Sequence, residues 1–200
     1  MKKKTVALLL ALTLVLGMAA GGTLAWLTDK TTPVVNTFTY GDINIELTET
    51  WNTDSDGDGT NDCWTAYMAP GYSYAKDPKV TVKADSVDCY LFVKFEKSND
   101  SLLTYTSNLM DNGWTQGTGE GGDGVPNNVW YRVVKSNDPV KSWELIANNT
   151  VSVASTVTKE QVKALGTKTA TLTYTAFACQ LKSDNNTNFT PAEAWARVAP

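Results

Sequence analysis

Four aspartates within nine residues form the sharpest chemical motif in this sequence. Counted from Asp54, the stretch DSDGDGTND places carboxylates at positions 1, 3, 5 and 9, namely Asp54, Asp56, Asp58 and Asp62. Gly59 falls at position 6, where calcium loops turn sharply, and Thr60 at position 7 offers a backbone carbonyl. Hard oxygen ligands at this spacing suit calcium better than zinc. We therefore predict a calcium site made by Asp54, Asp56, Asp58, Thr60 and Asp62.

The motif departs from a regulatory EF-hand at position 12. A bidentate glutamate is expected there, whereas this chain has Thr65. The flanks also read as strand and loop rather than helix, so the loop resembles the calcium loops of bacterial repeat proteins. We expect weak affinity and a role in bracing a long loop, not in chemistry. The alternative interpretation is a solvated, glycine-rich acidic turn.

The composition of the chain excludes the common arrangements of catalytic side chains. The chain has no histidine, which rules out Ser-His-Asp, Cys-His and HExxH arrangements. The run GTGEGGDG lacks the lysine and the strand-to-helix context of a phosphate-binding loop. We predict that the protein is not an enzyme and has no catalytic residues and no organic cofactor.

Tryptophan is abundant, and its role stays open at this point. Seven tryptophans could line a carbohydrate-binding groove, or they could pack a core, as they do more often. They are Trp26, Trp51, Trp64, Trp114, Trp130, Trp143 and Trp195.

The first residues have the organisation of a cleavable signal peptide. Lys2–Lys4 are followed by an apolar run over 6–16 and then by small residues that end at Ala25. The apolar run is short for spanning a bilayer, which takes about 20 residues, although an uncleaved anchor helix is the alternative. We predict cleavage by a signal peptidase after Ala25, so that contact with the membrane is limited to export and the protein is secreted.

The remaining 26–200 has the size and charge of one acidic domain. Removing 1–25 takes three of the 17 basic residues and none of the 21 acidic ones, which leaves a net charge of −7. This charge argues against nucleic acid and anionic membranes as partners. Three cysteines, Cys63, Cys89 and Cys179, leave disulfide pairing open, because an odd number leaves one thiol free.

Alternating apolar residues predict an all-β protein. In INIEL, Ile43, Ile45 and Leu47 share one face, and in CYLFVKFE every second residue from Cys89 does so. The stretch 168–181 is the longest and suggests a central strand. The predicted strands cover 43–47, 77–84, 89–96, 129–134, 150–155 and 168–181.

Two short helices have clear start signals. Thr158 and Gln161 form a capping-box pattern that Gly166 closes, and Thr190 precedes proline at the first position of a second helix over 190–198. We expect Trp195 and Val198 to pack this second helix onto the sheets. The fold class is therefore an antiparallel β-sandwich or jelly roll with two short helices.

Several segments resemble the TasA/camelysin family of exported Gram-positive proteins, which are processed by a SipW-type signal peptidase. The likeness lies in TLAWLTD, NTFTYGDINIELTE, APGYSYAKDPKVTV, YLFVKFE, LTYTAFACQ and AEAWARV. Cys89, Cys179 and the acidic loop are departures from that family's core, and the stretch 98–124 matches least.

The resemblance implies a jelly-roll subunit of extracellular biofilm-matrix or cell-surface fibres. In that family an N-terminal segment freed by cleavage can complete the sheet of the next subunit. Residues 26–40 are therefore a candidate donor strand, and a homo-oligomeric fibre is the expected assembly. The alternatives are a strand that folds back on its own chain and a surface-displayed module that binds carbohydrate or protein. The resemblance to camelysin also implies metalloendopeptidase activity, but this sequence contains no zinc motif that would support it.

Overall fold

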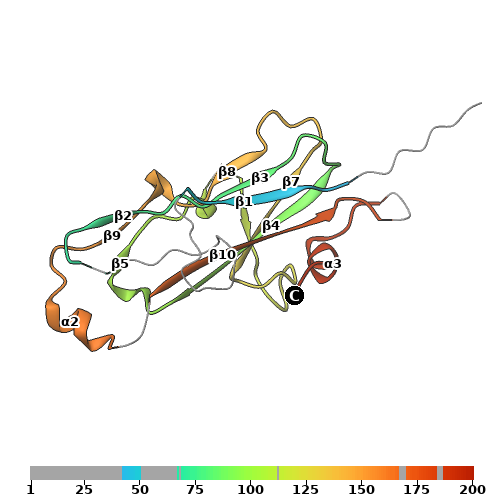
Figure 1. Cartoon of the computed structure of the whole chain (residues 1–200). Coiled ribbons are helices and arrows are strands. Elements are labelled where there is room, and N and C mark those ends of the chain that lie inside the picture. Colours follow the sequence, from blue (N-terminus) through green and yellow to red (C-terminus); the bar gives the residue numbers. More distant parts are fainter. Residues whose placement is uncertain (1–41, 51–66, 68, 112, 167–169, 184–186) are drawn as a thin grey trace, which may run out of the picture. The chain divides into compact units, whose positions relative to one another are not determined.

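The computed structural model describes residues 42–50, 67, 69–111, 113–166, 170–183 and 187–200, all within one compact unit, Tyr40–Pro200. The fold is all-β, with antiparallel pairing between the strands and two short α-helices (Figure 1). The predicted fold class, an antiparallel β-sandwich with two short helices, is confirmed.

Three sheets contain the described strands. The four-stranded sheet has the order β10 (Thr171–Gln180), β4 (Cys89–Ser98), β7 (Val129–Val134), β6 (Thr115–Gln116). The second sheet has the order β1 (Ile45–Thr48), β3 (Lys79–Val82), β8 (Ser142–Glu144). The third sheet has the order β2 (Ser73–Ala75), β9 (Thr150–Val153), β5 (Leu103–Thr104).

Short helical segments lie between these strands and after the last one. The two α-helices are α2 (Lys159–Ala164) and α3 (Pro191–Ala196), and each is opened by a threonine capping box. The predicted capping box of Thr158 and Gln161 is confirmed, as is the start of the second helix with Thr190 before proline. Three single-turn 3₁₀ helices are η1 (Asp100–Leu102), η2 (Asn108–Met110) and η3 (Ala147–Asn149). No helix in the described ranges is long and apolar enough to cross a membrane.

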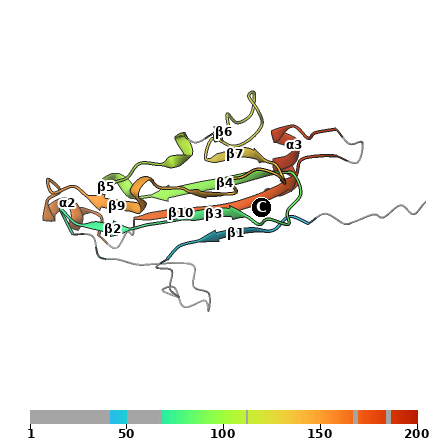
Figure 2. The same ribbon diagram turned by 90° about the horizontal axis from the view of Figure 1, so that it is seen from above.

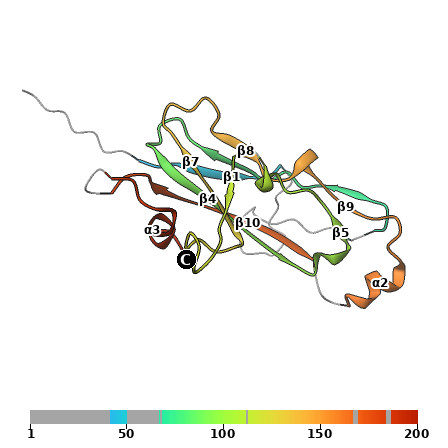
Figure 3. The same cartoon turned by 180° about the vertical axis from the view of Figure 1, so that it is seen from behind.

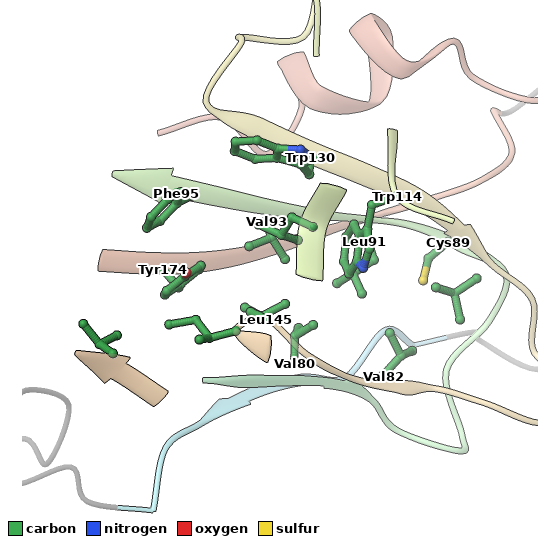
Figure 4. Packing of buried hydrophobic residues seen from close by; sticks show 14 residues of the cluster. Val80, Val82, Cys89, Leu91, Val93, Phe95, Trp114, Trp130, Leu145 and Tyr174 are labelled. Carbon is green, nitrogen blue, oxygen red and sulfur yellow. The ribbon is translucent and has the colours of Figure 1, made fainter. Parts of the chain in front are cut away.

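The main core lies between the sheet of β3 and the sheet of β4. Val80 and Val82 of β3 are buried, and Figure 4 shows them facing Leu91 and Val93 of β4. The period-two alternation of both strands directs these side chains to one side of each sheet. The prediction that Cys89, Leu91, Val93 and Phe95 share one face is therefore confirmed.

The four-stranded sheet is covered on both faces. Phe92 on the outer face of β4 is fully buried and contacts Trp195 of α3, with ring centroids 5.3 Å apart. Phe177 of β10 also packs against Trp195, so that α3 lies on β4 and β10 (Figure 3). The expected packing of Trp195 and Val198 against a sheet is confirmed. This second layer explains why β4 is apolar on both faces.

Candidate functional site

Among the described strands, β10 has the longest edge that no other described strand pairs with. All ten of its residues pair with β4, and no strand within the described ranges pairs with its other side. The expectation that this stretch is a central strand is therefore wrong, because β4 occupies the central position instead (Figure 2). The length of β10 reflects the long strand beside it and the apolar layers on its two faces, not neighbours on both edges.

Hydrogen bonding identifies which main-chain groups point outward from this edge. The Phe95 N–H donates to the Asn128 carbonyl at 2.8 Å, so the main-chain groups of Phe95 point toward β7. Tyr174 is the direct partner of Phe95 in β10, and its N–H and C=O therefore point away from β4. By the same alternation, the outward groups of β10 belong to Leu172, Tyr174, Ala176, Ala178 and Gln180. No backbone hydrogen bond within the described part of the chain uses them.

The side chains of β10 give this edge little protection against pairing. The strand reads TLTYTAFACQ and contains no charged residue, no proline and no glycine. Monomeric proteins usually protect an exposed edge with lysine, proline, a bulge or a very short strand. The absence of charge in this stretch is the sequence signal that could have identified the edge. A strand of this composition can accept another extended chain.

The core is incompletely covered next to the same edge. Strand β1 lies within contact distance of β10, and it too is the terminal strand of its sheet. Ile45 and Leu47 of β1 and Leu172 and Ala176 of β10 pack on the main core but are only partly buried. An additional strand at this edge would remove more of their apolar surface from water, which is worth roughly 25 cal/mol per Å².

Tyr174 brings a polar group from β10 into the main core. Its hydroxyl is buried and has no hydrogen-bond partner among the described residues. Burial raises the pKa of Tyr174, and the nearby Tyr105 and Glu49 act in the same direction. The phenol is therefore neutral at physiological pH and supplies no charge at the edge.

The predicted calcium ligands lie outside the described residues. Asp54, Asp56, Asp58, Thr60 and Asp62 all fall within 51–66, so the calcium site stays a prediction. Ala25 and the candidate donor strand 26–40 also fall outside the described ranges. Within those ranges, no group of three or more cysteine or acidic side chains is placed to hold a metal ion.

Two of the three cysteines are buried free thiols on opposite faces of one sheet. Cys89 lies in the main core, whereas Cys179 lies in the second cluster with Trp195. Cys179 pairs with Tyr90 and Cys89 pairs with Gln180, so the two thiols project to different sides and do not form a disulfide with each other. Burial raises the pKa of Cys89 to about 11. Cys63 lies outside the described residues.

The described tryptophans pack the protein interior. Trp114, Trp130 and Trp195 are each less than one-tenth exposed, and Trp143 is half-buried. The guanidinium of Arg132 lies over the rings of Trp143 and Trp114, at 4.1 and 5.4 Å from their centroids. No local pattern in the sequence indicates this role of Arg132, because its two aromatic partners are distant in sequence. These tryptophans therefore serve packing rather than an exposed carbohydrate platform.

Comparisons of this chain with family models, curated proteins and solved structures found no match.

Proposed function

We propose that this protein is a secreted structural subunit of extracellular fibres, in a biofilm matrix or on a cell surface, that assembles by strand addition. The observation that carries the proposal is the ten-residue, uncharged edge of β10, which no described strand covers. The outward N–H and C=O groups of β10 alternate along the strand, so they can form hydrogen bonds with the backbone of an extended chain that lies beside it. The proposal requires no catalytic group.

The donor in this proposal is the N-terminal segment of another copy. Cleavage after Ala25 gives a segment, 26–40, that carries Trp26, Leu27, Val34, Val35 and Phe38. Apolar side chains of such a segment would cover the partly buried residues of β1 and β10 while its backbone pairs with β10. One copy donates and the next accepts, so the contact does not close and a filament grows.

The proposal is tested by comparing 26–200 with 41–200 in negative-stain electron microscopy and analytical ultracentrifugation. We expect filaments or long oligomers for the first protein and monomers for the second. The peptide 26–40, added in excess, should bind to 41–200 and should stop filament growth of 26–200. A mature protein that stays monomeric at all salt and pH conditions would overturn the proposal.

A matched pair of variants tests the edge itself. The N–H of Ala178 points away from β4, so Ala178→Pro removes an outward donor without breaking the β4–β10 ladder. Ala178→Ser retains the donor and serves as the control. We expect the proline variant to remain folded and monomeric and the serine variant to assemble. Assembly of a folded proline variant at the wild-type rate would show that β10 is not the acceptor.

A further inference from the structure

A second unpaired edge lies in the middle of the four-stranded sheet, on the side of β4 that faces β7. Strand β4 pairs with β10 from Cys89 to Ser98, but it pairs with β7 only from Cys89 to Lys94. The last hydrogen bond on this side runs from the Phe95 N–H to the Asn128 carbonyl. Beyond Phe95, no strand within the described ranges lies beside this side of β4. The sheet therefore has a strand position beyond the end of β7 that no described strand fills.

Main-chain groups are available at this position. Phe95 and Lys97 have the same orientation in β4, so the Lys97 N–H and C=O and the Phe95 C=O point into the vacant position. No hydrogen bond within the described chain uses these three groups. A strand rises about 3.3 Å per residue, so the vacancy beside residues 95–98 is about 13 Å long.

An open cavity of about 890 Å³ lies at the same place. Its walls come from the end of β4, from η1, β5 and η2, and from the residues that lead into β7. Phe95, Tyr105 and Trp130 contribute aromatic side chains to it, and Met110, which is 68% exposed, lies at its rim. The cavity thus combines an unpaired strand edge with an apolar lining.

The charges around the cavity are already paired. The Lys97 ammonium bonds to the Asp100 carboxylate at 3.0 Å, and the Tyr105 hydroxyl donates to the same carboxylate oxygen at 3.0 Å. Glu96 pairs with Lys94 at 2.9 Å. A charged ligand would have to compete with these pairs, whereas an uncharged one would not.

We infer that this cavity binds a short, uncharged, extended peptide of a partner protein, which adds to the sheet beside the second half of β4. The peptide accepts a hydrogen bond from the Lys97 N–H and donates to the Lys97 and Phe95 carbonyls. It directs one apolar side chain toward Phe95 and Tyr105. This site is separate from the outer edge of β10, and the inference does not depend on fibre assembly.

Binding is tested by isothermal titration of the whole chain with a capped synthetic peptide of threonines around one central phenylalanine. The same peptide with N-methylated backbone amides should not bind, because it cannot donate to the strand. A version with lysines in place of the threonines should bind more weakly. A neutral oligosaccharide that binds where the peptide does not would overturn the inference.

Position 97 offers a matched pair of variants. The Lys97 N–H points away from β10, so Lys97→Pro removes the donor to the peptide without a loss of ladder bonds, and Lys97→Ala removes the side chain but keeps the donor. We expect about a tenfold or greater loss of affinity for the proline variant and near wild-type affinity for the alanine variant, with circular dichroism confirming that both fold. Equal affinity of the two folded variants would overturn the inference. Ala178→Pro, at the other edge, should leave peptide binding unchanged.

Discussion

Phe95 and Tyr174 stack face to face as direct partners across β4 and β10, with ring centroids 4.6 Å apart and ring planes inclined by 12°. Leu172 and Ala176, on either side of Tyr174 in β10, also pack on the main core, and Figure 4 shows both rings on the core side of the sheet. Stacking of this kind adds about 0.5–1.5 kcal/mol beyond the burial of the two rings. The two members differ in one respect, because only Tyr174 brings a polar atom into the core.

This difference predicts opposite results for two substitutions. Phe95→Ala should lower the free energy of unfolding by about 3–5 kcal/mol, because it leaves a cavity and removes the stack. Tyr174→Phe should leave the free energy of unfolding unchanged or raise it, because the buried hydroxyl has no partner among the described residues. Urea denaturation followed by tryptophan fluorescence measures both. A large destabilisation by Tyr174→Phe would mean that the hydroxyl has a hydrogen-bond partner in the folded protein.

The two capping boxes should contribute unequally to global stability. Thr190 caps α3, which buries Ala194 and Trp195 against the sheet, whereas Thr158 caps α2, which buries no residue. Loss of a threonine cap costs about 1 kcal/mol. We expect Thr190→Ala to lower the melting temperature and Thr158→Ala to fray α2 with little effect on that temperature. Thermal unfolding of the two variants in parallel makes the comparison, and an equal decrease would contradict it.

We expect the ionisation of Asp88 to make the free energy of unfolding depend on pH. The Ser136 N–H donates to its carboxylate at 2.8 Å and the Lys135 ammonium lies 3.3 Å away, and these contacts hold the pKa of Asp88 below its ordinary value of 3.8. A carboxyl with a lowered pKa in the folded state stabilises the protein above its unfolded-state pKa, and this stabilisation is lost as the pH falls through the folded-state pKa.

The measurement for Asp88 is a comparison of the wild type with Asp88→Asn across pH. The variant should be less stable than the wild type at pH 7, and the difference should shrink as the pH falls below 3.8. Urea denaturation at both ends of this range measures the difference. If the difference in the free energy of unfolding between the two proteins does not change with pH, the ionisation of Asp88 is not the cause of the effect.

Calcium binding by the acidic loop stays a prediction with a direct measurement. A cation that binds only the folded state raises the melting temperature by mass action. The melting temperature of the protein should rise with millimolar calcium relative to chelator, and Asp56→Ala should remove the shift. Asp111→Ala changes an exposed aspartate outside the loop and serves as the control. If neither calcium nor the substitution has an effect, the loop is a solvated acidic turn.

The sequence pattern predicted several strands well. The stretch 129–134 matches β7 residue for residue, and Ile43, Ile45 and Leu47 do share the face that packs on the core. The capping boxes were also readable, because each depends only on a threonine and a side chain three residues later. Local chemistry of this kind determines local structure, so no knowledge of distant contacts is needed.

The position of a strand within its sheet could not be predicted from the local sequence. The long threonine-rich stretch suggested a central strand, yet β10 is terminal among the described strands of its sheet, because the order of strands depends on which distant segments pair. The Arg132 contact with Trp114 and Trp143 likewise joins residues from three separate parts of the chain. The vacancy beside β4 follows from the unequal lengths of β4 and β7, a relation that no single stretch of sequence contains.

The continuous ladder between β4 and β10 has a mechanical consequence. Tension applied along β10 would load its bonds to β4 in shear, so that they resist together, instead of peeling apart one at a time. Strands β4 and β10, which share this ladder, are therefore well suited to transmit a pulling force into the body of the protein.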